Sequence, residues 1–202
     1  RTINTKALYS KLDKLLESSP VMDLNSKKRW VIFSDLHMGD GGDTDDFKRN
    51  AKLFETTLKD FYQKKEYALI LNGDVEELQR FQIKKIVKQW KSIYDIFDDF
   101  NKKDNLFKTI GNHDLELQLM KELPFDYKHY ESLRLKFGKD SLFVFHGHQA
   151  SKKYQEHNEL IGFTLKYFAN PLGIKSYSVS HSSRKQYKIE KSVYGFSAFN
   201  KV

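Results

Sequence analysis

The pattern of hydrophobic and polar positions predicts helices that alternate with short buried strands in the first half of the chain. In some stretches apolar residues recur three or four positions apart, which is the spacing of a helix with one face on a core. In others they follow one another directly, as is typical of a short strand buried on both faces. The expected helices are residues 7–16, 45–65 and 77–100, and the expected strands are residues 30–34, 67–71 and 106–110.

The order of these elements predicts the fold class. Strands that alternate with helices are typical of a largely parallel sheet covered by helices, so we expect an α/β protein. Residues 133–137 and 141–145 flank Gly138, Lys139 and Asp140, and they are expected to form a β-hairpin.

The composition changes near residue 150. Residues 151–202 are rich in Lys, Tyr, Ser and Phe and lack a clear strand pattern, while residues 154–168 have a helical face. We therefore expect a main domain of residues 1–150, with a leading helix at 5–18, and a mainly helical insertion or cap at 151–202.

Composition and charge narrow the class of protein only a little. The 202 residues are 39% hydrophobic and 31% charged, which is enough apolar material for a substantial core. No apolar run approaches the roughly 18 residues of a membrane span. The chain has no cysteine, which excludes disulfides and thiolate metal sites. A formal net charge of +8 suits anionic partners, although a lysine-rich solvated surface explains it equally well.

Polar residues that can bind metal or move protons follow each of four predicted strands. In order along the chain they are Asp35 and His37, then Asp74, then Asn112, His113 and Asp114, and last His146. In open α/β sheets, ligands bind at the carboxyl ends of the strands. We therefore expect these side chains to meet at one edge of the sheet.

The residue types indicate a metal site. Carboxylate oxygens and imidazole nitrogens suit divalent manganese, iron and zinc. A carboxylate such as Asp74 can bridge two ions, and Asn112 can add a neutral oxygen. Two ions ~3.5–4 Å apart would clamp a phosphate and acidify a bound water.

Each motif taken alone has a simpler interpretation. Asp35 and His37 are compatible with a capped turn, Asn112 to Asp114 with a cap before a helix at 115–121, and His146 with a core histidine. Four strand ends in order, each with ligand-type residues, are hard to obtain by chance. Together they favour the metal site.

The four motifs also carry a family resemblance. "SDLHMGD", "NGDVEE", "GNHDLE" and "FHGHQ" resemble the successive signatures of the calcineurin-like metallophosphoesterase superfamily, over residues 30–149. This resemblance implies a four-layer α/β/β/α sandwich with a two-metal centre. It also implies hydrolysis of phosphomonoesters, phosphodiesters or pyrophosphates.

By matching position, the resemblance implies roles for five metal ligands. Asp35 and His37 would bind the first ion, Asp74 would bridge, and Asn112 and His146 would bind the second ion. The expected cofactors are two divalent ions of manganese, iron or zinc, with manganese favoured.

The resemblance also implies the catalytic residues. His113 would face the scissile phosphate and assist the leaving group as general acid, and Asp114 would orient or polarise His113. A metal-activated hydroxide would attack phosphorus. Arg80 lies just beyond the Gly73–Asp74 loop and is expected to reach a substrate phosphate or to form a surface salt bridge.

The chain departs from the family pattern after His146. The family closes with a Gly-His-x-His motif that completes both metal sites, and none follows here. We expect a C-terminally incomplete fold, either a fragment or a chain with a weaker metal site and low activity. The alternative function is a catalytically weak scaffold or binding module, but His113 favours catalysis.

The region after "FHGHQ" resembles the helical insertion of UDP-diacylglucosamine hydrolases, on the stretch "NPLGIKSYSV". Its apolar residues would then line an acyl pocket, or they simply pack the insertion on the domain. The residues concerned are Phe163, Leu165, Tyr167, Phe168 and Leu172. Those hydrolases carry Arg in place of His113, which favours a related but distinct branch.

The expected substrate is therefore a phosphorylated small molecule or a lipid-linked one. We expect a cytoplasmic protein, with peripheral contact to the inner membrane as an alternative. Nucleic acid is not an expected partner, because the sequence shows no groove of interleaved aromatic and basic residues.

Overall fold

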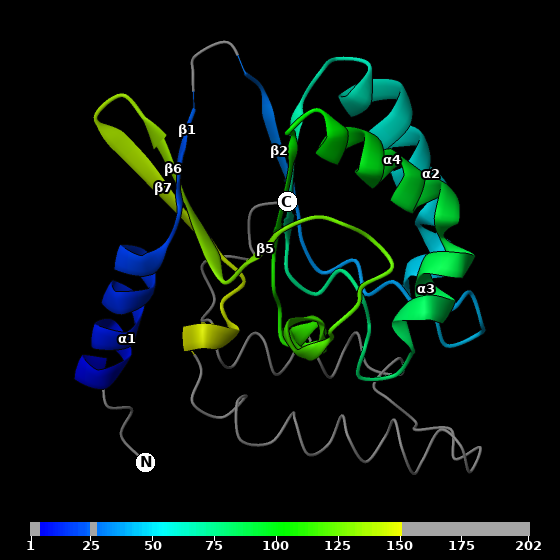
Figure 1. Ribbon diagram of the computed structural model, residues 1–202, viewed down its shortest axis with the longest axis horizontal. Helices are drawn as coiled ribbons and strands as arrows, with labels where there is room; N and C mark the ends of the chain where they lie inside the picture. Colours follow the sequence, from blue (N-terminus) through cyan, green and yellow to red (C-terminus); the bar gives the residue numbers. More distant parts are fainter. Residues whose placement is uncertain (1–4, 25–27, 151–202) are drawn as a thin grey trace, which may run out of the picture.

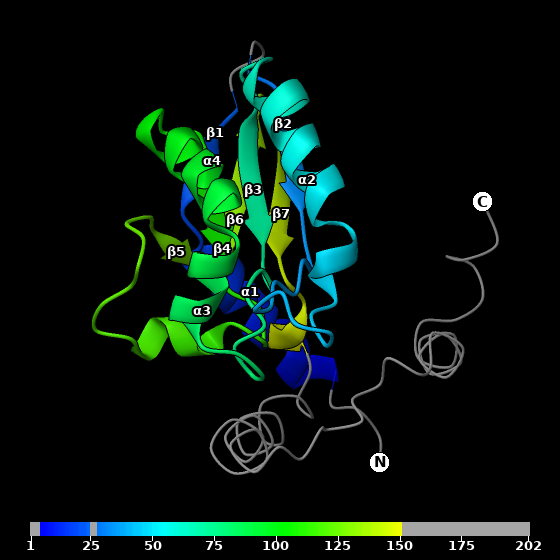
Figure 2. The same cartoon turned by 90° about the vertical axis from the view of Figure 1, so that its right-hand side faces the viewer.

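The computed structural model describes residues 5–24 and 28–150, which form two sheets with helices (Figures 1 and 2). The first sheet has the order β2-β3-β4-β5 and is parallel throughout. Its strands are β2 (Trp30–Phe33), β3 (Ala68–Asn72), β4 (Leu106–Thr109) and β5 (His129–Tyr130). The second sheet has the order β1-β6-β7, with strands β1 (Val21–Asp23), β6 (Ser132–Phe137) and β7 (Asp140–Phe145). The mixed α/β architecture predicted from the sequence is confirmed.

The helices cover one face of the first sheet, and the second sheet packs on its other face (Figures 1 and 2). They are α2 (Ala51–Thr57), α3 (Ile83–Gln89) and α4 (Lys91–Lys102). β3 shows how the layers join. Leu69 and Leu71 belong to the core beneath the helices, whereas Ile70 belongs to the core between the sheets. Successive side chains of a strand point to opposite faces, so this one strand contributes to both cores.

Helix α1 (Thr5–Ser18) lies beside β6 and the 3-10 turn η4 (His148–Ala150). The Ser19 hydroxyl contacts the Ser132 hydroxyl at 2.6 Å, which ties the end of α1 to the start of β6. None of the helices in the described part of the chain is both long enough and apolar enough to cross a bilayer.

The expected hairpin is confirmed, because β6 and β7 pair in antiparallel fashion with Phe137 opposite Asp140. The continuous helix expected at 77–100 is wrong. Helix α3 begins only at Ile83, and Trp90 separates it from α4. Residues before Ile83 pair with the loop after β2 instead, since the N–H of Glu77 donates to the Met38 carbonyl at 3.0 Å.

The helix expected at 45–65 is divided into three pieces. A 3-10 turn η1 (Phe47–Arg49) comes first, α2 follows, and a π-helical turn η2 (Leu58–Gln63) ends the segment. The predicted 115–121 helix is a 3-10 turn, η3 (Leu115–Leu119). The expected helix at 154–168 and the 151–202 insertion lie outside the described residues.

Candidate metal centre

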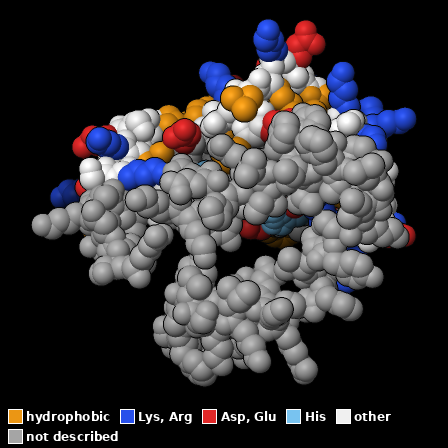
Figure 3. All heavy atoms as spheres, turned by 90° about the horizontal axis from the view of Figure 1, so that it is seen from below, with side chains coloured by type: hydrophobic (Ala, Val, Ile, Leu, Met, Phe, Trp, Pro, Cys, Tyr) orange, Lys and Arg blue, Asp and Glu red, His pale blue; other side chains and the backbone are white. Residues whose placement is uncertain are grey.

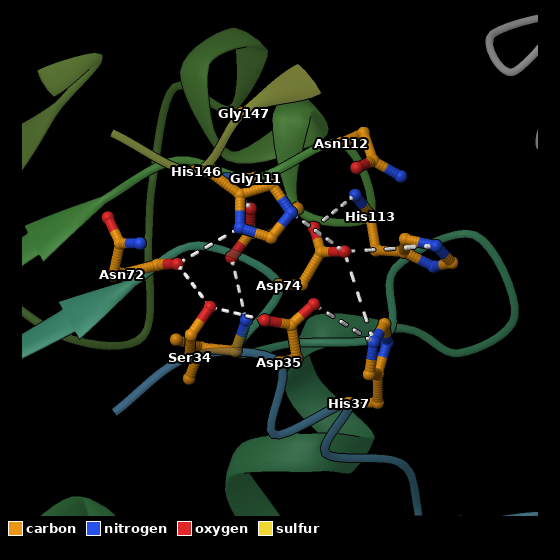
Figure 4. Close-up of polar contacts among 12 residues, drawn as sticks. Ser34, Asp35, His37, Asn72, Asp74, Gly111, Asn112, His113, His146 and Gly147 are labelled. Atoms are coloured by element: carbon orange, nitrogen blue, oxygen red, sulfur yellow. Dashed lines mark hydrogen bonds and ion pairs between the residues drawn. The ribbon is translucent and has the colours of Figure 1, made fainter. Parts of the chain in front are cut away.

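The parallel strands β2, β3 and β4 end at the same edge of their sheet, and the loops that follow carry all but one of the predicted ligands (Figure 4). The exception is His146, which follows β7 of the second sheet, so the site is built from both sheets and not from one sheet edge as expected. One atom lies at the centre. The Oδ2 of buried Asp74 is 3.2 Å from the Nε2 of His146 and 3.9 Å from the Nε2 of both His37 and His113. Asp35 Oδ1 lies 3.9 Å from His37 Nε2. Figure 3 shows histidine and acidic side chains next to one another at this end of the molecule.

The other ring nitrogen of each histidine has a partner behind it. The Nδ1 of His37 is 3.1 Å from Glu77 Oε2, and that of His113 is 2.8 Å from Glu77 Oε1. The Nδ1 of His146 is 3.0 Å from the Asn72 carbonyl oxygen, which can only accept. These partners favour the tautomer with the proton on Nδ1 and present three Nε2 atoms to Asp74, as hydrogen-bond acceptors behind metal-bound histidines do.

The backbone bends sharply at three predicted ligands. Asp35, His37 and Asp74 have positive φ angles of 57°, 48° and 50°. For residues other than glycine this region costs roughly 1–3 kcal/mol, and it persists where surrounding contacts impose it. Here the contacts are hydrogen bonds between the loops: Asp35 N–H donates to the Gly73 carbonyl at 3.1 Å, and His37 N–H to the Asp74 carbonyl at 2.9 Å.

Glycines allow these loops to approach one another. A Cβ on Gly73 would lie 2.5 Å from the ring of His146, and a Cβ on Gly111 would lie 2.1 Å from Asp74 Oδ1 and 2.3 Å from Asp74 N. No side chain fits at either position without moving a predicted ligand. The glycines in "NGD" and "GNHD" are therefore part of the site.

Replacing Gly111 by alanine is expected to destabilise the fold by about 1–3 kcal/mol, as overpacking does, and to weaken metal binding because Asp74 must move. Chemical denaturation and metal titration measure the two effects. Gly42→Ala is the matched control: Gly42 is exposed, and its new Cβ would meet only the flexible Asp40 carboxylate, at 3.0 Å. A Gly111→Ala protein that binds metal as tightly as the Gly42→Ala protein would contradict this account.

Glu77 is the residue that the sequence analysis missed. Its two carboxylate oxygens divide between His37 and His113, whose rings meet edge to face at 4.7 Å. Burial alone would raise the pKa of Glu77, but hydrogen bonds from His113 and His37 lower it to about 2, so it is ionised at neutral pH. The motif "NGDVEE" contains Glu77, but the expectation of a helix from residue 77 placed it on a helical turn.

The Asp114 carboxylate, which the family resemblance expects to orient or polarise His113, makes its described contacts with other groups. Asp114 is fully buried, and its carboxylate accepts the N–H of Val75 at 3.0 Å and that of Gly111 at 2.5 Å. Within the described residues, the carboxylate that hydrogen-bonds the Nδ1 of His113 belongs to Glu77, at 2.8 Å. Asp114 thus shapes the backbone of the loop, and Glu77 holds the ring.

The ion pair between His146 and Asp74 perturbs both groups. Burial alone would lower the pKa of His146, but the hydrogen bond and charge of Asp74 raise it to about 9. Burial would likewise raise the pKa of Asp74, but His146 and His113 lower it to about 2. In the metal-free protein, His146 is therefore protonated at neutral pH, and its Nε2 proton occupies the position that a metal ion would take.

Metal affinity is expected to rise with pH and to approach its maximum near pH 9. The pKa of folded His146 is raised from 6.5 to about 9, so its ion pair stabilises the metal-free fold fully below pH 6.5 and is lost as pH rises through 9. A metal ion must displace that proton, so binding near pH 7.5 should release about one proton. Calorimetric titrations of metal into the protein, in buffers of different ionisation enthalpy, measure the number of protons released. An affinity that is flat between pH 6.5 and 9 would contradict the assignment.

Two other predicted site residues lie at the margin. Asn112 stands on the loop after β4, beside His113 (Figure 4), and its backbone carbonyl accepts from the Gln79 side-chain amide at 3.2 Å. Arg80 was expected either to reach a substrate phosphate or to form a surface salt bridge. It forms a salt bridge with Asp46 at 3.2 Å, and it also donates to the Thr44 carbonyl. The residues predicted to line an acyl pocket lie outside the described residues.

The donor set fits divalent metal ions. In the described part of the chain, two groups have ligand atoms within 4.8 Å of one another: Asp35, Asp74 and His146, and His37, Asp74 and His113. Bonds of about 2.1 Å from one ion to two such atoms require them to be about 4 Å apart or closer, which the distances to Asp74 satisfy. Asp74 belongs to both groups, as a bridging ligand would. The second group contains His113, which the sequence analysis assigned to the substrate.

Comparison with protein-family models matches residues 28–189 to the calcineurin-like phosphoesterases. The match covers most of the chain and includes all four motifs. Searches of curated proteins and of solved structures gave no match. The motifs, the two-sheet architecture and the cluster around Asp74 agree with the family match, and the chain belongs to the calcineurin-like phosphoesterase family, whose members are metal-dependent hydrolases of phosphoric esters.

Proposed function

We propose that this protein hydrolyses a phosphodiester or pyrophosphate bond, or a phosphomonoester, of a nucleotide- or lipid-linked substrate. The observation that carries the proposal is the convergence of three imidazole Nε2 atoms on one oxygen of Asp74, with each Nδ1 held from behind. A structural ion pair needs one such histidine, whereas a site that binds metal and substrate needs several.

Asp35, His37, Asp74, Asn112 and His146 would hold the metal ions. Bound divalent ions supply Lewis acidity toward a phosphoryl oxygen and lower the pKa of a coordinated water. The protein fixes the ligands beforehand through Glu77, the Asn72 carbonyl and the left-handed backbone. This preorganisation means that little rearrangement is needed when the ions and substrate bind.

His113 is proposed to donate a proton to the leaving oxygen from Nε2. Its N–H on Nδ1 donates to Glu77 at 2.8 Å, which fixes the orientation of the ring and leaves Nε2 on the side of Asp74. The backbone N–H of His113 donates to Asp74 Oδ1 at 2.8 Å, so His113 is also bound to the residue at the centre of the candidate ligand groups. Both contacts hold the proposed acid next to the proposed metal ligands.

The test is hydrolysis of bis-p-nitrophenyl phosphate with added Mn²⁺, after the protein has been stripped with a chelator. We expect activity only after metal is restored, and we expect it to saturate with metal. Activity that survives complete chelation would contradict a metal-dependent mechanism. Protein that binds metal tightly but hydrolyses none of the phosphodiester, phosphomonoester or pyrophosphate substrates would instead support the scaffold alternative.

The substrate class is tested by comparing pairs that differ in one feature. UDP-diacylglucosamine and a UDP-sugar without acyl chains share the pyrophosphate and differ in the lipid. Faster hydrolysis of the acylated member would support a lipid-linked substrate. Equal rates would support a substrate recognised by its phosphates alone.

A further inference from the structure

A lysine is buried directly beneath the candidate metal centre. Lys108 lies on β4, and its side chain is fully buried. Its Nζ is 2.6 Å from Glu76 Oε2 and 3.4 Å from Asp114 Oδ2, and both carboxylates are also buried. None of these three side chains belongs to the candidate ligand groups described above.

The position of Lys108 would suit an apolar residue on energetic grounds. Lys108 pairs with Leu71 on β3 and with His129 on β5, and the alternate positions of its own segment, Leu106 and Ile110, belong to the hydrophobic core. Lysine is almost never fully buried unless it is paired. Removing two opposite charges from water costs several kcal/mol per ion, and well-packed apolar replacements of buried ion pairs are often neutral or stabilising. A buried ionic group of this kind therefore calls for an explanation other than fold stability.

Each carboxylate belongs to a different loop of the site. Glu76 lies in the loop after β3, between Asp74 and Glu77, and its Oε1 accepts the hydroxyl of Tyr94 on α4 at 2.8 Å. Asp114 lies in the loop after β4 and accepts the N–H groups of Val75 and Gly111. Lys108 is the cation between them, so its ammonium group joins the two loops from below.

The same two loops meet again at the site itself. His113 N–H donates to Asp74 Oδ1 at 2.8 Å, and the His113 ring contacts Glu77 at 2.8 Å. These contacts have a narrow range of good geometry, and both weaken steeply if the loops separate. Without Lys108, Glu76 and Asp114 would both lose the cation that each of them contacts, and a buried carboxylate without a partner either costs several kcal/mol or takes up a proton. In either case the ionic contact that joins the two loops is lost.

We infer that Lys108 is a positioning residue that holds the loops after β3 and β4 in the register the metal centre requires. Its contacts place Asp74 and Glu77 on one side against Asn112 and His113 on the other. The inference rests on the proposed metal site, and it assigns to Lys108 a function through Glu76 and Asp114 rather than a contact with metal or substrate.

The first test is Lys108→Met, with Lys91→Met as the matched control. Lys91 is exposed on α4, where it pairs with Asp95, so its loss removes a lysine without touching the loops. We expect Mn²⁺ affinity, measured by calorimetry on protein shown to be folded, to fall about 10- to 100-fold in Lys108→Met, as changes behind metal ligands do. It should stay unchanged in Lys91→Met.

A second measurement reports the loops without any metal. The Nδ1 proton of His113, hydrogen-bonded to Glu77, should give a downfield NMR resonance in the metal-free protein, which His113→Gln assigns. Lys108→Met should lose or shift this resonance, and Lys91→Met should retain it. A merely structural lysine would lower the unfolding midpoint and leave the resonance in place in folded protein.

The double variant Lys108→Met with Glu76→Met keeps the inference testable if the single variant does not fold. It removes the unpaired carboxylate, so its unfolding midpoint should return toward that of the wild type, while metal affinity and the His113 resonance stay defective. Wild-type affinity and resonance in the double variant would overturn the inference, and so would its failure to fold, which would give the pair a role in the whole core. If the wild type itself binds no metal, the proposed function fails, and the resonance alone decides the inference.

Discussion

Replacing Asp74 by asparagine is expected to abolish tight metal binding and to lower phosphodiesterase activity by roughly a thousandfold or more. Asp74 lies in both candidate ligand groups, and its Oδ2 is the atom on which the histidine Nε2 atoms converge. Metal ions supply several kcal/mol of transition-state stabilisation, and about 4 kcal/mol corresponds to a thousandfold in rate. An amide retains the shape of the side chain but loses its charge.

Asp40→Asn is the matched control for this experiment. Asp40 belongs to the same opening motif as Asp35 and His37, but its carboxylate accepts only a local hydrogen bond from Gly42 N–H at 3.1 Å among the described contacts. The activity of the Asp40→Asn variant should remain within about twofold of the wild type, since substitutions away from buried contacts usually have small effects. Comparable losses in the two variants would mean that Asp74 does not organise the site.

Replacing His113 by glutamine should affect substrates according to their leaving groups. A general acid contributes typically 10²–10⁴-fold when the leaving oxygen needs a proton. Alkyl esters need that proton and should slow by this factor, whereas p-nitrophenolate leaves without one. The ratio of the two rates, measured on the same protein preparation, isolates proton donation from any general damage to the site.

The comparison of the two leaving groups also distinguishes the two roles that the structure allows for His113, metal ligand and general acid. If His113 bound metal as a member of its candidate group, the His113→Gln variant should lose metal affinity and slow both substrates alike. If it acts as the acid, the Mn²⁺ affinity should remain close to that of the wild type. Glu77→Gln should show the same leaving-group pattern at smaller amplitude, because the ring remains but its orienting carboxylate is lost.

The sequence could predict the parts of the site that depend on strand ends. Asp35 and Asp74 come two and three residues after the apolar runs that end at Phe33 and Leu71, and parallel strands bring such positions to one edge whatever the exact loop geometry. His146 directly follows an apolar run as well, but its strand β7 belongs to the second sheet, so this rule does not account for its place in the site. The hairpin of β6 and β7 was predictable for a similar reason, because Gly138 to Asp140 separate two alternating stretches. These features depend on local patterns that tertiary contacts reinforce.

The parts that could not be predicted depend on contacts between distant loops. Residues 77–82 have the apolar spacing of a helix, but bonds to the Met38 and His113 carbonyls hold Glu77 and Leu78 in a loop. Asp114 stands next to His113 in sequence, yet its carboxylate contacts the Lys108 ammonium group at 3.4 Å. Lys108 is a charged residue within a short strand, and the hydrophobic pattern alone does not predict that it is buried. Strands β1 and β5 have three and two residues, too short for any periodicity to register.

The carboxylate of Glu77 has a thermodynamic consequence because it serves two rings at once. His37 is a predicted metal ligand, and His113 is the proposed acid, and each donates to a different oxygen of the same group. Any movement of this carboxylate therefore moves both rings. Metal binding through His37 and substrate binding at His113 would be coupled through one side chain. By linkage, the factor by which metal changes the affinity for substrate is also the factor by which substrate changes the affinity for metal.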